Sequence, residues 1–234
     1  MAKKVFIDPG HGGNDSGAVG VNNLYEKMIN LSVSQKIVNL LKKQGLEVKM
    51  SRDSDTTMSL QERTNMANSW QADCFVSIHC NAHTGSAKGL ETYGYNLNTI
   101  DLATYIHEEV LKTDAYTLNR GIKVAGFYVV RNTNMRSALI ELAFIDNEED
   151  VKILLEKQDI LADGIAKGIC KYLGVEYKSE IYDNTNNEIE VVDSNTFYRV
   201  VCGSYNNRLY AEEKLEELKS LGVEDAFIVT YEKE

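Results

Sequence analysis

The chain has 234 residues, 43% of them hydrophobic, which is enough apolar content for a packed core, and its formal net charge is −10. The charge is uneven: residues 176–234 hold 14 acidic and 6 basic residues and carry −8, whereas residues 1–175 carry −2. The acidic balance argues against nucleic acid as a partner, because phosphates would repel it. No stretch approaches the ~20 apolar residues of a membrane span, so we expect no membrane insertion.

The N-terminus and the cysteines indicate where the chain is made. Met-Ala-Lys-Lys is followed by a short apolar run ending in Asp8 rather than by the apolar region of a signal peptide. We therefore expect synthesis in the cytoplasm without a cleaved leader. The four cysteines form no CxxC pair, so reduced thiols are expected rather than disulfides.

Strands and helices alternate between Lys3 and Leu173. Apolar runs predict strands, and apolar residues at helical spacing predict helices. The expected strands are residues 3–8, 46–52, 72–81, 89–95, 126–130 and 137–145. The expected helices are residues 26–44, 59–70, 98–112, 146–155 and 157–173. This alternation predicts an α/β fold with a mostly parallel central sheet flanked by helices.

The C-terminal part departs from this pattern. Residues 176–195 are polar, acidic and rich in asparagine, which is typical of a linker. Residues 196–234 then predict one small strand–helix–strand (βαβ) unit, half of a ferredoxin-like sheet. We therefore expect a first domain over residues 1–175, a linker over 176–195 and a small unit over 196–234.

Four chemically active side chains are expected at one edge of the sheet. His11 follows the first strand, Glu26 begins the first helix, His79 ends the third strand, and Glu141 lies near the end of a late strand. Functional groups gather at the carboxyl ends of parallel strands. Two imidazoles and one carboxylate, with a fourth position open, form a typical catalytic zinc set. The other carboxylate is then available as a general base.

Each of these residues also has an ordinary explanation. A histidine at a strand end is often only hydrogen-bonded, and Glu26 at the first turn of a helix is favourable against the helix dipole. Glu141 is harder to explain, since burying a carboxylate in an apolar strand is costly unless something pairs with it. His107 in "HEEVL" is no HExxH motif, because Leu111 occupies the position of the second histidine.

Two further residues are candidates for substrate binding. Asn81 is close to His79 in sequence and either contacts substrate or caps the strand. Arg52 either binds a substrate carboxylate or forms a salt bridge with Asp53 or Asp55.

The segments "FIDPGHGGNDSGAVG", Glu26, "SIHCNA", "GLETY" and "ALIELAFIDN" together resemble the zinc-dependent N-acetylmuramoyl-L-alanine amidases of the amidase-3 type. The resemblance covers about Lys3–Leu173, with the motifs in the order of the family. It implies that His11, Glu26 and His79 bind Zn²⁺ and that Glu141 is the catalytic glutamate.

The implied reaction is hydrolysis of the amide between N-acetylmuramic acid and L-alanine in peptidoglycan. In this mechanism zinc polarises the carbonyl and activates water, and Glu141 passes the proton of the water to the leaving amine. Some members of the family carry a helix that covers the zinc. The short connection "AHTGSAKGLE" leaves no room for one, so we expect an open site.

Action on the cell wall requires release from the cytoplasm. A phage endolysin or an autolysin of the sporulating mother cell would both fit, and we favour the endolysin. The alternatives are another zinc amidohydrolase or peptidase of the wall, or a non-catalytic wall-binding module whose metal is structural.

The C-terminal unit, "FYRVVCGSYNNRLYAEEKLEELKSLGVEDAFIV", resembles half of a SPOR peptidoglycan-binding repeat. A complete SPOR domain contains two such halves. We therefore expect two chains to pair their halves into one sheet, which would make the protein a homodimer. The alternatives are that the half-unit packs on the first domain or is only marginally folded.

Overall fold

The structure is a computed structural model that describes residues 2–178 and residues 211, 212, 214–216, 219, 228 and 230. The chain separates into two compact units, Met1–Ser179 and Glu180–Glu234, and the fold below is that of the first. Residues 211, 212, 214–216 and 219 are helical, within a segment for which the sequence predicts a helix. The rest of the predicted SPOR-like unit, most of the predicted linker and the predicted dimer contact lie outside the described residues.

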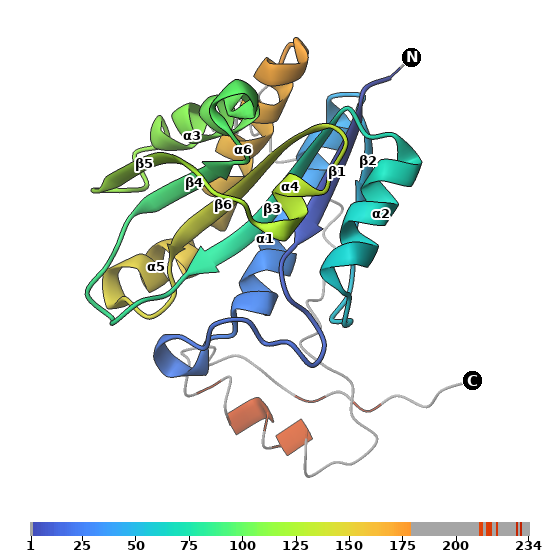
Figure 1. The fold of residues 1–234 in the computed structure, drawn as a ribbon. Coiled ribbons are helices and arrows are strands. Elements are labelled where there is room, and N and C mark those ends of the chain that lie inside the picture. The colour runs from blue at the N-terminus through green and yellow to red at the C-terminus, as the bar shows by residue number, and fades with distance from the viewer. Residues whose placement is uncertain are drawn as a thin grey trace, which may run out of the picture. The chain divides into compact units, whose positions relative to one another are not determined.

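The first unit is built on a six-stranded sheet with the strand order β2-β1-β3-β6-β4-β5 (Figure 1). The strands β1, β2, β3 and β6 run parallel to one another, whereas β4 is antiparallel to β6 and parallel to β5. The predicted α/β fold with a mostly parallel sheet is therefore confirmed. The strands are β1 (Lys4–Pro9), β2 (Glu47–Met50), β3 (Cys74–Asn81), β4 (Leu90–Gly94), β5 (Asn119–Val124) and β6 (Arg136–Phe144).

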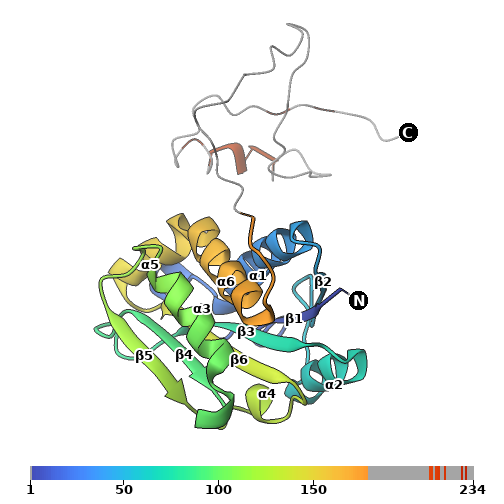
Figure 2. The ribbon, with the colours of Figure 1, turned by 90° about the horizontal axis from the view of Figure 1, so that it is seen from above.

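Helices cover the two faces of the sheet unequally. Figure 2 shows α1, α3 and α6 packed across one face and only α2 and the short α4 on the other. The longer helices are α1 (Glu26–Lys43), α2 (Leu60–Trp70), α3 (Asp101–Leu111), α5 (Glu148–Glu156) and α6 (Gln158–Leu173). The shorter ones are α4 (Tyr128–Arg131) and two 3₁₀ turns, Val21–Asn23 and Leu97–Thr99.

The alternation of side chains along the strands produces two apolar clusters. The larger lies under α1, α3 and α6, and the smaller contains Phe6, Phe75 and Leu139 on the side of α2 and α4. Because side chains point to the same face at every second position, the side that holds Phe75 and Leu139 also carries His79 and Glu141. His79 and Glu141 therefore lie on the less covered face.

The prediction of a strand over residues 126–130 is wrong. Residues 128–131 form α4, whereas the strand at this point of the chain is β5, seven residues upstream of the expected start. A run of four apolar residues is compatible with either element, and both Val129 and Val130 are buried against the smaller cluster. β5 escaped prediction because it is an edge strand with a glycine in its interior and little apolar character.

The predicted N-cap of the second helix is confirmed. Ser59 caps α2 and forms a capping box with Glu62, which satisfies exposed amide groups of the first turn. The described cysteines Cys74, Cys80 and Cys170 are buried free thiols. Within the described part of the chain, no helix combines the length and the apolar character required to cross a bilayer.

Candidate active site and metal centre

Three of the predicted site residues meet at the carboxyl edge of the sheet. His11 follows β1, Glu26 is the first residue of α1, and His79 lies in β3. His11 Nε2 lies 3.2 Å from Glu26 Oε2, and His79 Nδ1 lies 2.9 Å from Glu26 Oε1. One potential ligand atom of each residue lies within 4.8 Å of those of the other two. The carboxylate of Glu26 thus bridges two imidazole rings that are distant in sequence.

Mutual electrostatics shift the pKa values of these three groups. Burial alone would lower the pKa of His11, but hydrogen bonds and charge from Glu26 and Asp15 outweigh it and raise that pKa to about 9. The pKa of His79 is also raised, since its contact with Glu26 outweighs burial. Burial would raise the pKa of Glu26, yet the two imidazoles bring it well below its usual range. The buried carboxylate of Glu26 therefore stabilises the protonated, positively charged forms of the two imidazoles.

Glu141 lies on the strand next to His79. The two residues are register partners on the parallel strands β6 and β3. Glu141 Oε2 is buried and has no hydrogen-bond partner among the described residues. Burial raises the pKa of Glu141 to about 7, against a smaller opposing effect of the charge on His79. A carboxyl group of this kind is suited to exchanging protons near neutral pH.

The loop that presents His11 is held by two buried arginines. Arg63 donates to the carbonyl of Pro9 at 2.6 Å and to that of His11 at 2.7 Å. It also forms a buried salt bridge with Asp8 at 2.8 Å. Arg52 donates to the carbonyls of Pro9 and Gly10 at 3.1 and 2.8 Å. These contacts fix the backbone of the turn between β1 and the histidine.

Two glycines leave room for the ligand side chains. A Cβ atom on Gly10 would lie 2.2 Å from Cε1 of His79, so the imidazole packs directly on the backbone of the loop. A Cβ on Gly17 would lie 2.6 Å from Oε2 of Glu26, and Gly17 has φ +65°. His11 itself has φ 59°, a left-handed conformation that is rare for residues other than glycine. Such strain is tolerated where the surroundings hold the backbone in place.

Asn81 and Arg52 have contacts within the protein. The amide of Asn81 donates to Glu91 Oε2 at 3.1 Å, and its Oδ1 accepts the N–H of Ala82 at 2.9 Å. Arg52 is 4% exposed and donates to backbone carbonyls, including those of Ser54 and Lys27. The guanidinium of Arg52 is therefore engaged by backbone carbonyls of the loops, and substrate binding by Arg52 or Asn81 stays a prediction.

The sequence interpretation missed a second set of charged residues. Glu91 in β4 is buried beside Glu141, which is its register partner, and it forms ion pairs with Arg120 and Lys123. It also missed the role of Arg63. The sequence did contain a signal for both. Glu91 in "GLETY" and Asp8 in "VFID" are carboxylates within apolar strands, and a buried carboxylate requires a partner.

Neither His83 nor His107 belongs to the described group of potential metal ligands. His107 is buried in α3, where its ring contacts Thr92 Oγ1 and Asn119 Oδ1, both at 2.9 Å. It is therefore part of an amphipathic helix, as predicted.

The connection between β3 and β4, residues 82–89, contains no helix, so no covering helix arises from this segment.

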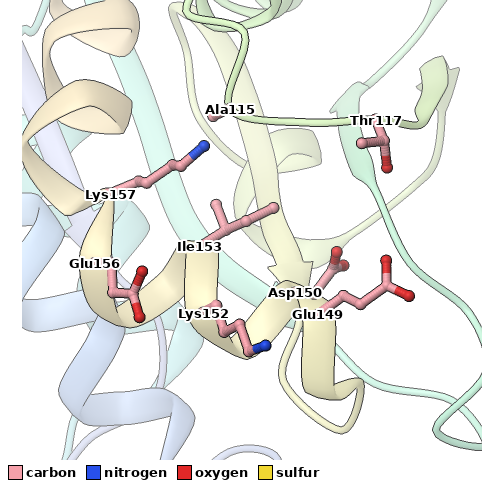
Figure 3. A pocket seen from close by; sticks show the side chains of 8 residues that line it. All are labelled: Ala115, Thr117, Glu149, Asp150, Lys152, Ile153, Glu156 and Lys157. Carbon is pink, nitrogen blue, oxygen red and sulfur yellow. The ribbon is translucent and has the colours of Figure 1, made fainter.

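A surface cavity of about 240 Å³ lies beside α5 (Figure 3). It shares no residue with the histidine and glutamate cluster. Its Asp150 accepts the backbone N–H groups of Gly89 and Phe144, both at 2.8 Å, and its Glu149 pairs with Lys88. These acidic groups therefore connect α5 to the sheet, and the chemistry is best placed at the cluster formed by His11, Glu26, His79 and Glu141.

The chemistry of the donor set fits a divalent metal ion. Two neutral imidazoles and one carboxylate are the ligands that catalytic zinc takes in proteins, and a fourth position stays open to substrate or water. The short distances among the three side chains and the unpartnered oxygen of Glu141 fit such a site. Fold and site together are those of a candidate hydrolase whose centre could hold a divalent metal ion.

Residues 5–171 match the family model described as N-acetylmuramoyl-L-alanine amidase. The chain belongs to this amidase-3 family. The matched range contains both histidines and both glutamates of the site.

Similar proteins agree with this assignment. The sporulation-specific N-acetylmuramoyl-L-alanine amidase of Bacillus subtilis is 34% identical over 97% of this chain and 84% of its own length. The endolysin of Bacillus phage SPP1 is 40% identical over 76% of this chain and 69% of its own. The catalytic domain of CwlV, an amidase from Paenibacillus polymyxa, superposes with a TM-score of 0.71 at 37% identity, covering 74% of this chain and 99% of that domain.

Proposed function

We propose that this chain is a zinc-dependent peptidoglycan amidase that hydrolyses the bond between N-acetylmuramic acid and L-alanine. The observation that carries the proposal is the convergence of His11, Glu26 and His79 with the unpartnered oxygen of Glu141. Membership of the amidase family supports the choice of substrate.

His11, Glu26 and His79 would hold the metal. When bound, zinc supplies Lewis acidity that polarises an amide carbonyl and makes water a stronger acid. The buried loop contacts of Arg52 and Arg63 keep the ligands in position. Preorganised ligands of this kind avoid a reorganisation cost during the reaction.

Glu141 would serve as the proton carrier. Its Oε2 would accept a proton from the attacking water and return it to the nitrogen of the leaving L-alanine, because the amine is a poor leaving group unless protonated. The position of Glu141, one strand from His79 and buried, supports this role.

The biological setting is part of the proposal. The match to the sporulation-specific amidase covers 97% of the chain, whereas the match to the phage endolysin covers 76%. The longer match supports an autolysin of sporulating cells, and the match to the phage endolysin supports the endolysin that we favoured from the sequence, so both settings stay proposals. Action on the wall after release from the cytoplasm belongs to the same proposal.

Dimer formation through the C-terminal unit also remains a proposal. Its basis is the resemblance of residues 196–234 to half of a SPOR repeat. Light scattering of the full chain tests it: a mass of twice 26.3 kDa supports the dimer, and the single-chain mass contradicts it.

Mass spectrometry of digested peptidoglycan tests the activity. We expect new peptides that begin with a free L-alanine amine, together with glycan chains of unchanged length. The matched control is the Glu141→Gln variant, prepared in the same way. New reducing sugar ends, or cleavage within the peptides, would instead indicate a different hydrolase. The absence of all products in the presence of added zinc would favour a wall-binding module.

A further inference from the structure

A buried carboxylate with an excess of positive charge lies next to the candidate active site. Glu91 is the register partner of Glu141 on the adjacent strand and is 2% exposed. Its Oε1 accepts hydrogen bonds from Arg120 Nε and from Lys123 Nζ, the latter at 2.8 Å. Its Oε2 accepts the hydroxyl of Tyr93 at 2.5 Å and the amide of Asn81 at 3.1 Å. Both carboxylate oxygens of Glu91 therefore accept hydrogen bonds from neighbouring side chains.

The charges of this group do not cancel. Arg120 and Lys123 both pair with Glu91, so these three side chains together carry one net positive charge. A buried carboxylate requires compensation, but one cation is enough to provide it. The side chains of the two cations are 32% and 40% exposed, so both remain accessible to a solute. The second charge is thus available to a ligand.

Arg120 is oriented as an anion receptor. Within the described part of the chain only its Nε has a protein acceptor, which leaves the two terminal nitrogens of the guanidinium without one. The centre of the guanidinium lies 4.9 Å from the ring centroid of Phe144, which restricts the plane of the group. An arginine fixed in this way offers a fork of N–H donors that matches the two oxygens of a carboxylate.

The distance from the reacting centre limits which carboxylate can bind. β5 lies two strand spacings from β6, which corresponds to about 10 Å. An extended peptide spans about 3.3 Å per residue, so this distance equals about three residues. A carboxylate within the first few residues of a peptide that follows the scissile amide would reach Arg120.

We propose that Arg120 and Lys123 bind a carboxylate of the stem peptide and select acidic peptides over amidated ones. This inference rests on the proposed function, because it assigns a substrate subsite to the same reaction. Glu91 then has a positioning role, since it holds both cations at the side of the sheet where Glu141 lies.

Two matched muramyl peptides test this proposal. They differ only at the residue after L-alanine, which carries a free carboxylate in one and a carboxamide in the other. The quantity measured is kcat/KM for each peptide with zinc-loaded full-length protein. We expect the wild type to prefer the carboxylate about tenfold or more, as for a lost charged hydrogen bond.

The variants separate binding from stability. Arg120→Gln is expected to lower kcat/KM for the carboxylate peptide to that for the carboxamide, which itself should change little. Arg120→Lys, which keeps the charge but not the fork, should retain part of the preference. Lys123→Gln provides a second variant in case Arg120→Gln folds poorly. The matched control is Arg136→Gln at the opposite end of β6, where the exposed arginine pairs with Asp101, and it should keep the full preference.

The possible failures are distinguishable. If the wild type hydrolyses neither peptide, the proposed function is wrong, and the subsite is then judged from calorimetric binding of both peptides to the Glu141→Gln variant. Equal rates of the wild type on both peptides would overturn the subsite while leaving the amidase function intact. An equal loss on both peptides in folded Arg120→Gln would show a purely structural role and would also overturn it.

Discussion

His79 and Glu141 are register partners on the adjacent parallel strands β3 and β6. Glu91 on β4 is in turn the partner of Glu141 on its other side, so His79, Glu141 and Glu91 form a row across three neighbouring strands. This arrangement gives Glu141 a cationic centre on one side and a satisfied acidic residue on the other.

Replacement of Glu141 with glutamine is expected to remove hydrolysis while keeping the metal. Glutamine has the same shape but cannot accept and return a proton, and loss of a general base typically costs about 10²–10⁴-fold in rate. Measured amide hydrolysis should fall by this factor, while zinc content by elemental mass spectrometry remains at one ion per chain. Undiminished hydrolysis would show that another residue moves the proton.

Replacement of His79 with alanine is expected to remove zinc-dependent stabilisation. A ligand that binds only the folded state at 100 times its Kd stabilises it by about 2.7 kcal/mol. Zinc should therefore raise the melting temperature of the wild type but not that of His79→Ala. The matched control is His83→Ala, since His83 is an exposed histidine in the connection after β3 and should leave the zinc effect unchanged. An equal zinc effect in the His79 variant would remove this residue from the ligand set.

Replacement of Gly10 with alanine is expected to displace the ring of His79. The added Cβ would lie 2.2 Å from Cε1 of that ring, and real Cβ atoms do not approach so closely. Zinc affinity and activity should fall together, and by more than thermal stability falls. Gly126→Ala is the control, because a Cβ there meets nothing within 4 Å. Unaltered zinc affinity in Gly10→Ala would show that the loop can shift without cost.

The four residues at the centre of the site are predictable from sequence for a topological reason. The carboxyl ends of parallel strands meet at one edge, so His11, His79 and Glu141 had to lie close together once their strands were identified. Glu26 followed because the first helix begins where the loop from β1 ends. The family resemblance assigned roles to these residues, but their proximity depends only on strand direction.

The supporting residues were not predictable in the same way. Arg63 contacts the carbonyls of Pro9 and His11 across 54 and 52 positions of the chain. Such contacts depend on which carbonyl faces which guanidinium, and no periodic pattern reports this. Arg120 was missed because its strand was missed: β5 is an edge strand, and apolar and polar residues do not alternate along it.

The buried pair of Asp8 and Arg63 is expected to be important for folding. Removing one partner of a buried ion pair leaves an uncompensated charge and typically costs about 3–5 kcal/mol. The free energy of unfolding in urea should fall by about this amount in Arg63→Met. The exposed pair of Arg136 and Asp101 is the control, since surface pairs contribute about 0–1 kcal/mol. Equal effects of Arg63→Met and Arg136→Gln would show that the buried pair contributes little.

The contacts of Glu91 are expected to make stability depend on pH in the acidic range. Burial would raise the pKa of this carboxyl, but hydrogen bonds from Lys123, Tyr93 and Arg120 outweigh it and bring the pKa from 4.5 to about 2. Since the folded pKa is the lower one, the folded state binds fewer protons at this group than the unfolded state does. The contribution of Glu91 is therefore complete above pH 4.5 and is lost as the pH falls towards about 2.

Comparison with Glu91→Gln isolates this effect from the other carboxyl groups. The difference in unfolding free energy between the wild type and the variant should be largest above pH 4.5 and should shrink steadily towards pH 2. Urea unfolding at intervals across this range measures it. Glu108→Gln, at an exposed position of α3, provides a matched control for the loss of a carboxylate. A difference that stays constant with pH would show that Glu91 contributes through its shape and packing rather than through its charge.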